Sequence, residues 1–196
     1  MHALEATASP LVRRYTLEEF YALGPPTGGG HYELIAGVLY MVPPPSRRHA
    51  DAVSRLLLVF AAYAAAHPDR CQLFVPRAPV WTPADTYLEP DFFLVATERL
   101  RQMGDENPTS ADLVVEVLSP STAVYDRTAK ADTYAALGVR ELWLVDLETE
   151  TIEQRILAGG AWQVGPPHAG AASLESAAFP GLRLIPAEIL AGAGPA

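Results

Sequence analysis

Cysteine is almost missing from this 196-residue chain, which has Cys71 alone. A single cysteine excludes a disulfide framework within the chain and a zinc site built from several cysteines. The N-terminal sequence Met-His-Ala-Leu-Glu-Ala-Thr lacks the basic segment that precedes the apolar part of a signal peptide. Together these features favour a reducing compartment, and we expect the protein in the cytoplasm.

Long apolar runs and an excess of basic charge are missing as well. The longest apolar stretch, residues 56–66, is far shorter than the ~20 residues that a membrane-spanning helix needs. The net charge of −9 excludes a passive basic coat on nucleic acid, because non-specific affinity comes mainly from Lys and Arg side chains that neutralise phosphates. It does not exclude a nuclease whose basic residues are local and whose carboxylates hold a metal ion.

Lysine is the third scarce residue, since Lys130 is the only one and all other basic side chains are arginines. Lysine is a compact charge whose pKa can move, whereas arginine is a fixed planar fork. Asp126, Lys130 and Tyr134 are spaced by four and therefore share one helix face. One interpretation is a solvated Asp–Lys pair beside a half-buried tyrosine. The other directs Lys130 at nearby carboxylates, where it would orient water or stabilise charge on a phosphate while Asp126 orients the lysine.

The composition and the order of the predicted elements indicate one α/β domain. With 49% hydrophobic and 19% charged residues, the composition is that of an ordinary globular protein. We expect the domain to cover residues 15–190, between a flexible N-terminus (residues 1–14) and a C-terminal tail (residues 191–196). The near-continuous apolar run over residues 113–118 predicts a central strand buried on both faces.

Hydrophobic periodicity and capping residues give the expected elements. The predicted helices cover residues 16–23, 47–66 and 121–137. Thr16 and Glu19 form a capping-box pattern for the first, and Ser46 can cap the second. The predicted strands cover residues 31–42 (a hairpin), 72–81 (with a break at a proline), 88–95, 113–118, 141–147 and 151–164 (a second hairpin), followed by a strand-like piece with a helical turn over 179–190. The two long helices would cover the faces of a mixed sheet.

Two acidic residues are candidate metal ligands. Glu116 lies within the apolar strand predicted over residues 113–118, where a buried carboxylate needs a metal ion or a cation to compensate its desolvation. The alternative is a strand-end glutamate paired with an arginine. Asp91 follows Pro90 at the start of another apolar run, and alone it would be an ordinary turn aspartate. If it lies across neighbouring strands from Glu116, the pair favours a hard ion such as Mg²⁺ or Mn²⁺.

Glu33 and His49 are weaker candidates. Glu33 comes just before a predicted turn, where a polar residue is unremarkable. His49 lies near the start of a predicted helix, where a histidine is commonly structural or exposed. We therefore treat both as supporting residues of the site.

These residues stand in an order that resembles a known family. The motifs are Glu33-Leu-Ile-x-Gly37, Ser46-x-x-His49, Glu89-Pro-Asp91, Asp112-Leu-Val-Val-Glu-Val-Leu-Ser-Pro-Ser-Thr122, Asp126-x3-Lys130-x3-Tyr134 and Gly138-Val-x-Glu141-Leu-Trp143-Leu-Val-Asp146. This pattern is similar to the Uma-two family of restriction-endonuclease-like proteins, within the PD-(D/E)XK nuclease superfamily. The resemblance runs from about residue 15 to residue 190.

The resemblance implies a restriction-endonuclease-like αβββαβ core, with a mixed central sheet flanked by helices, an N-terminal hairpin and C-terminal strands. It also implies Mg²⁺-dependent (or Mn²⁺-dependent) hydrolysis of phosphodiester bonds in nucleic acid, with DNA as the expected substrate and a homodimer as the expected assembly. Asp91, Glu116 and Glu33 would be the metal ligands. The chain departs from the superfamily pattern at Leu118, where a lysine is expected, and the resemblance implies that Lys130 replaces it.

Two other functions stay open on the sequence. A catalytically inactive nuclease-fold protein, acting in binding or assembly, would fit the negative charge and the missing lysine at Leu118. A hydrolase with two carboxylates, such as a glycosidase, would also use Asp91 and Glu116. The lone Lys130 and the lack of aromatic residues around the two carboxylates favour the nuclease over this last class.

Overall fold

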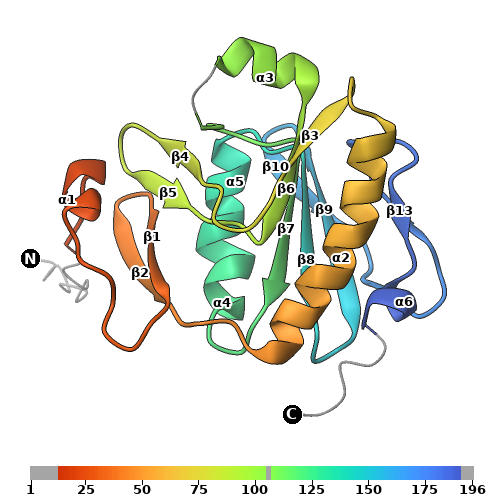
Figure 1. Ribbon diagram of the computed structural model, residues 1–196, viewed down its shortest axis with the longest axis horizontal. Helices are drawn as coiled ribbons and strands as arrows, with labels where there is room; N and C mark the ends of the chain where they lie inside the picture. The colour runs from red at the N-terminus through yellow and green to blue at the C-terminus, as the bar shows by residue number, and fades with distance from the viewer. Residues whose placement is uncertain (1–12, 105–106, 191–196) are drawn as a thin grey trace, which may run out of the picture.

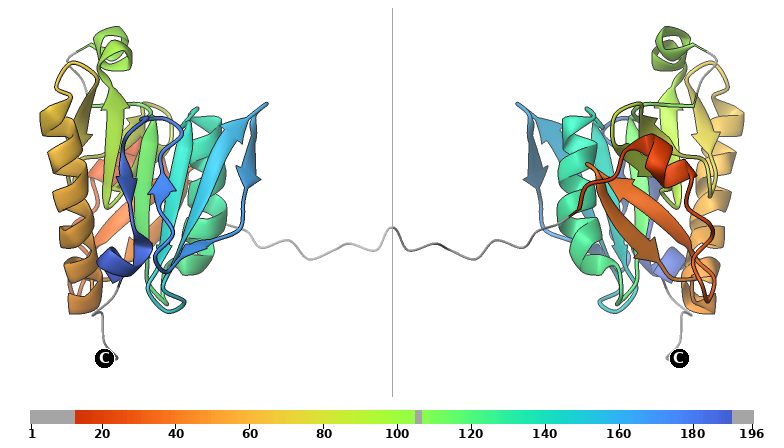
Figure 2. Two further views of the ribbon diagram at one scale, coloured as in Figure 1. Left: turned by 90° about the vertical axis from the view of Figure 1, so that its right-hand side faces the viewer. Right: turned by 90° about the vertical axis from the view of Figure 1, so that its left-hand side faces the viewer.

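The computed structural model describes residues 13–104 and 107–190. These residues form a large mixed sheet flanked by helices, together with a smaller antiparallel sheet (Figures 1 and 2). The predicted mixed α/β class is thus confirmed. Most of the predicted flexible N-terminus (residues 1–12) and the whole predicted tail (residues 191–196) lie outside the described residues.

Helices separate several groups of consecutive strands along the chain. The helices are α1 (Leu17–Tyr21), α2 (Arg47–Ala66), α3 (Thr97–Met103), α4 (Ala123–Tyr125), the π-helical turn η1 (Asp126–Lys130), α5 (Ala131–Ala136) and α6 (Pro186–Leu190). The strands are β1 (His31–Ile35), β2 (Val38–Val42), β3 (Cys71–Phe74), β4 (Val80–Thr82), β5 (Thr86–Leu88), β6 (Phe92–Ala96), β7 (Leu113–Leu118), β8 (Glu141–Asp146), β9 (Thr151–Ala158), β10 (Ala161–Val164), β11 (His168–Ala169), β12 (Leu174–Glu175) and β13 (Arg183–Leu184).

The large sheet has the strand order β10-β9-β8-β7-β6-β3, and β11 pairs with β9. Its strands are antiparallel except for β7 and β8, which are parallel. A parallel pair needs a crossover, and α4, η1 and α5 supply it between these two strands. Helix α2, strands β3, β6 and β7, the crossover helix and β8 therefore reproduce the expected αβββαβ order.

The two faces of this sheet carry separate apolar cores. Helix α2 covers one face, where Phe60 packs edge-to-face on Phe92 and Trp143 with ring centroids 4.8 and 5.5 Å apart. Helix α5 covers the other, where Tyr134 packs among buried residues that include Phe93 (Figure 1). Both long helices thus cover the sheet as predicted, and β7 between them is buried at all of its positions.

The small sheet has the order β2-β1-β5-β4. Strands β1 and β2 form the predicted hairpin, and Ala36 and Gly37 turn it with φ angles of 47° and 80°. Positive φ at both central residues gives a turn whose twist matches the flanking strands. The Gly37 amide also donates to the Asp85 carbonyl at 2.8 Å, which ties the hairpin to the segment before β5.

Two predicted strands are wrong in the same way. Residues 72–81 were expected as one interrupted strand, but β3 belongs to the large sheet and β4 to the small one. Between them, Pro76 cannot donate to a strand ladder, and Arg77 has a φ of 73° that reverses the chain. Residues 88–95 also divide, into β5 and β6, at Pro90. These crossings hold the two sheets together beside the candidate site.

The helices differ from prediction in two respects. The helix expected over residues 121–137 contains the π-helical turn η1 between α4 and α5. Helix α3 was not predicted. The strand-like piece with a helical turn expected over residues 179–190 corresponds to β13 and α6. Helix α2 has 20 residues and is apolar enough, by length and composition alone, to cross a membrane. Its buried residues pack on the large sheet, as those of a core helix do.

Candidate active site

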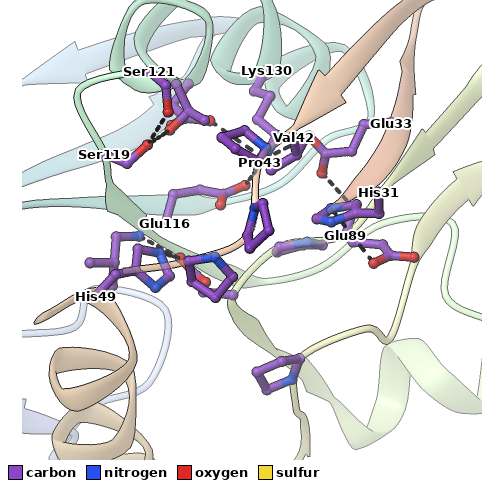
Figure 3. Close-up of a pocket in the computed structure, with 18 of the residues that line it drawn as sticks. His31, Glu33, Val42, Pro43, His49, Glu89, Glu116, Ser119, Ser121 and Lys130 are labelled. Atoms are coloured by element: carbon purple, nitrogen blue, oxygen red, sulfur yellow. Dashed lines mark hydrogen bonds and ion pairs between the residues drawn. The ribbon is translucent and has the colours of Figure 1, made fainter. Parts of the chain in front are cut away.

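A pocket opens where the two sheets meet helix α2 and the crossover helix (Figure 3). Its volume is about 420 Å³, within the usual range for ligand sites. The predicted residues Asp91, Glu116 and Lys130 all line it, together with Glu33 and His49. Residues that are far apart in the sequence therefore converge on one cavity.

Asp91 immediately precedes β6, and its carboxylate is fixed by the neighbouring strand. Phe92 pairs with Val115, so Asp91 stands next to Glu116 on the adjoining strand β7. The Val117 amide donates to Asp91 Oδ2 at 2.7 Å. The side chain is 18% exposed, so Asp91 stays open to a ligand in the pocket.

Glu116 is held inside β7 with only 4% of its surface exposed. The Tyr134 hydroxyl donates to Oε1 at 2.6 Å, and Lys130 Nζ donates to the same oxygen at 3.0 Å. Burial raises the pKa of Glu116 to about 8 although the charge of Lys130 opposes that shift. The carboxyl group therefore holds its proton at neutral pH unless further positive charge enters the pocket.

Lys130 is the cation at the centre of an acidic cluster. Its Nζ lies 3.0 Å from Glu116 Oε1, 3.1 Å from Glu33 Oε2 and 3.5 Å from Asp126 Oδ1. Burial alone would lower the pKa of Lys130, but the charges of Glu116 and Glu33 hold it well above the ordinary value. The lysine is therefore charged despite its burial.

The π-helical turn η1 presents this lysine. Asp126 begins the turn and Lys130 ends it, and both are buried, whereas the predicted alternative was a solvated pair. Tyr134 follows one turn later in α5 and reaches Glu116. A single π-helical turn inside an α-helix is frequent at functional sites, because it inserts one residue and redirects the side chains around it.

Glu33 enters the pocket from β1 and is completely buried. Its Oε1 accepts a hydrogen bond from the Glu89 amide at 2.8 Å, and its Oε2 faces Lys130. Burial raises the pKa of Glu33, although Lys130 counteracts the shift. In this arrangement Glu33 holds Lys130 in place, and its predicted role as a metal ligand stays a prediction.

His49 reaches the site from the first turn of α2. The Ser46 side chain caps that helix by accepting from the His49 amide at 3.2 Å. The His49 Nε2 atom lies 3.3 Å from Asp91 Oδ2. Burial alone would lower the pKa of His49, but the hydrogen bond with Asp91 and the charge of that residue raise it overall. His49 and the Val117 amide thus contact the same oxygen of Asp91.

Comparison with known proteins assigns the chain to a family. A family model, Uma2, described as "Putative restriction endonuclease", matches residues 17–188. The chain belongs to this family. Among solved structures, it is similar to one described as a "putative nuclease belonging to DUF820" from Anabaena variabilis ATCC 29413. The two chains are 20% identical, with a TM-score of 0.71, over 90% of this chain and 97% of the other. That likeness confirms the nuclease-like fold. A search of curated proteins found no match.

Further residues that had been given no role from the sequence also line the pocket of this Uma2 chain. They include His31, Glu89 and Tyr125. Burial raises the pKa of Glu89 and lowers that of His31 to about 4, so the histidine is neutral. The Tyr125 hydroxyl is buried with no hydrogen-bond partner among the described residues. Of these three residues, only Glu89 could have been recognised from the sequence, because it begins the Glu89-Pro90-Asp91 motif.

The charged side chains around the pocket decide whether a metal ion can bind there. Its lining includes the carboxylates Glu33, Glu89, Asp91, Glu116 and Asp126, against the cations Lys130 and Arg77. In the described part of the chain, no three His, Cys, Asp or Glu side chains form a metal-holding group by themselves. Mg²⁺ does not require one, since it commonly takes one or two carboxylates and completes its shell with water and substrate phosphate. The Asp91–Glu116 pair fits that requirement.

Proposed function

We propose that this Uma2 protein is a metal-dependent nuclease that hydrolyses phosphodiester bonds in nucleic acid, with DNA as the expected substrate. The contact between Lys130 and Glu116 is the observation that carries the proposal. In the superfamily pattern the lysine lies two residues after the glutamate, but Leu118 occupies that position and packs in the core. Lys130 brings the missing cation to the same carboxylate from the following helix.

Asp91 and Glu116 would hold Mg²⁺ or Mn²⁺, with Glu33 as a predicted further ligand. When bound, such an ion lowers the pKa of coordinated water and polarises the scissile phosphate. The donor set suits a hard ion, since it consists of carboxylate oxygens.

The chain's own groups prepare these ligands. Tyr134 and Lys130 fix one oxygen of Glu116, while the Val117 amide and His49 fix one oxygen of Asp91. The second oxygen of each carboxylate would then be the one that binds the cation.

Lys130 has a second proposed task, at the phosphate. The distance from Lys130 Nζ to Asp126 Oδ1 is the longest of its three contacts, at 3.5 Å. The N–H group directed at Asp126 is therefore the easiest to redirect to a phosphoryl oxygen. A fixed cation near the developing charge of the transition state accelerates such reactions. Before substrate binds, Asp126 would orient the lysine, which is the role expected from the sequence.

A cleavage assay tests the proposal. Plasmid DNA, single-stranded DNA and RNA are incubated with Mg²⁺, Mn²⁺ or EDTA and with wild type, Asp91→Asn or Glu116→Gln. Glu98→Gln is the control, because Glu98 is an exposed carboxylate on α3 outside the pocket. We expect metal-dependent cleavage by wild type and by the control, and a loss of at least a hundredfold in both site variants. Metal-independent cleavage, or full activity in either site variant, would contradict the proposal.

The other function left open is a nuclease-fold protein that binds without turnover. The net charge of −9 favours it, because few cations face a polyanion. Cleavage of none of the three substrates by wild type would support this alternative. The homodimer and the cytoplasmic location stay predictions, and light scattering of the purified protein would measure the first.

A further inference from the structure

A second hollow lies beside the candidate active site, between helix α1 and the small sheet. Its volume is about 260 Å³. Aromatic side chains form much of its wall: Phe20 and Tyr21 from α1, Tyr32 from β1 and Tyr87 from β5. We call these four residues the aromatic groove. Figure 1 shows α1 against the small sheet, at the end of the molecule away from α2.

Three rings of the aromatic groove, those of Phe20, Tyr21 and Tyr87, form a cluster that is only partly covered. Phe20 lies on Tyr87 with ring centroids 4.9 Å apart, and Tyr21 meets Tyr87 edge-to-face at 5.8 Å. Tyr21 is 61% exposed. A single exposed aromatic residue is ordinary on a protein surface, but several that line one hollow mark a binding surface.

The aromatic groove adjoins the pocket of the candidate active site. His31, Arg77 and Glu89 line both hollows, and Figure 3 shows His31 and Glu89 at the edge of the pocket. The Tyr87 side chain is hydrogen-bonded to Glu89. Arg77, which is 69% exposed, lies 3.4 Å from the same carboxylate. A chain-like ligand can therefore extend from one hollow into the other past Arg77.

The walls of the pocket limit which nucleic acid can enter. Pro43, Pro44 and Pro45 line it together with Pro76 and Pro90. Proline has no backbone N–H to offer a phosphate, whereas its ring packs well on the flat face of a base. The pocket is thus built for few phosphate contacts and for apolar contact with an unpaired nucleotide.

We propose that the aromatic groove binds the single-stranded part of a nucleic acid whose scissile phosphodiester lies in the catalytic pocket. This inference extends the proposed nuclease function and depends on it for the identity of the reacting bond. Unpaired bases expose faces that stack on aromatic side chains, and such stacking tolerates any sequence. Bases within a duplex are stacked on one another and cannot use these rings.

The test is binding of fluorescein-labelled oligonucleotides, measured by anisotropy in EDTA so that no cleavage occurs. The probes are a 12-nucleotide single strand and a blunt duplex of the same sequence. The variants are Tyr21→Ala, Tyr21→Phe, which keeps the ring, and Leu58→Ala, a control that removes an exposed apolar side chain from α2 outside both hollows. We expect Tyr21→Ala to weaken single-strand binding by about 5- to 50-fold, and the other two variants to stay within about twofold of wild type.

Three results would overturn the inference: no single-strand binding by wild type, equal binding by Tyr21→Ala and wild type, or duplex binding as tight as single-strand binding. Hydrolysis of bis(p-nitrophenyl) phosphate by wild type with Mn²⁺ is measured in parallel, because this small diester does not need the groove. If binding depends on Tyr21 but the diester is not hydrolysed, the binding role of the aromatic groove stands and the proposed nuclease function is contradicted. If the diester is hydrolysed but binding does not depend on Tyr21, the nuclease function stands and the role of the groove is contradicted.

Discussion

At the scale of single residues, the site is governed by the cost of enclosing carboxylates. Glu116 is surrounded by apolar strand neighbours and by the acids Glu33 and Asp126, with Lys130 as the buried cation among them. Burial raises the pKa of Glu116 to about 8, so the positive charge of Lys130 alone does not keep this carboxyl group ionised at neutral pH. A divalent cation would provide further positive charge, which links metal binding to the release of a proton.

The first prediction concerns the pH dependence of stability. The pKa of Glu116 rises from its ordinary value of 4.5 to about 8 on folding, so this group stabilises the fold fully only below pH 4.5 and loses that contribution as pH rises through 8. Glu116→Gln removes the titration. Without metal, we expect wild type to lose on the order of a few kcal/mol of its free energy of unfolding, relative to Glu116→Gln, between pH 5 and pH 8. Urea denaturation at both pH values measures it, and a constant difference would contradict the assignment.

Lys130→Met gives the second prediction, because methionine keeps much of the volume and removes the charge. Loss of one partner from a buried ion pair costs about 3–5 kcal/mol. We expect thermal unfolding to show a larger loss at pH 8 than at pH 5, since Glu33, Glu116 and Asp126 can take up protons at the lower pH. Arg101→Met is the control: Arg101 forms an exposed ion pair with Glu98, and such pairs contribute little. Equal losses in the two variants would contradict the central place of Lys130.

At the scale of elements, helix α2 shows how a cap serves the site. Ser46 accepts from the His49 amide and so fixes the turn that carries His49 to Asp91. We expect Ser46→Ala to cost about 1 kcal/mol of stability. Ser54→Ala is the matched control, because Ser54 is exposed in the middle of the same helix and bonds only to the Ala50 carbonyl. Chemical denaturation that showed equal effects in the two variants would contradict the capping role.

The sequence indicated the elements that obey local rules. The capping box of Thr16 and Glu19, the cap at Ser46 and the end of the crossover helix near Gly138 are all where predicted. The apolar pattern around Glu116 also indicated a strand buried on both faces. These signals depend on neighbours within a few residues along the chain.

What the sequence did not reveal depends on contacts between distant segments. Pro76 was recognised as a break and Pro90 as a strand start, but nothing local shows that the chain changes sheets at these prolines. The π-helical turn at Asp126 is also invisible in the spacing, because its side chains keep the order of an ordinary helix face. The burial of Glu89 depends on the position of the small sheet, so its place in the pocket could not be predicted.

At the scale of the whole molecule, charge limits how the chain can bind nucleic acid. The net charge is −9, and among the described residues that line the two hollows the Lys and Arg side chains are Lys130 and Arg77. We expect the log–log salt slope of single-strand binding to lie between about −0.7 and −1.4, from about −0.7 for each of one or two phosphate contacts. Anisotropy titrations between 50 and 200 mM salt measure it. A slope steeper than about −4 would indicate a phosphate-binding surface elsewhere on the molecule.

The central claim is that Asp91 and Glu116 form a metal-dependent centre, and titration calorimetry with Mn²⁺ tests it without knowledge of the substrate. At pH 8, wild type and Glu98→Gln should bind Mn²⁺ with the same affinity, while Asp91→Asn and Glu116→Gln should each bind at least tenfold more weakly. Lowering the pH to 6 should weaken binding to wild type, because the ion must displace the proton of Glu116. Unchanged Mn²⁺ binding in both site variants, or none in wild type, would contradict the account.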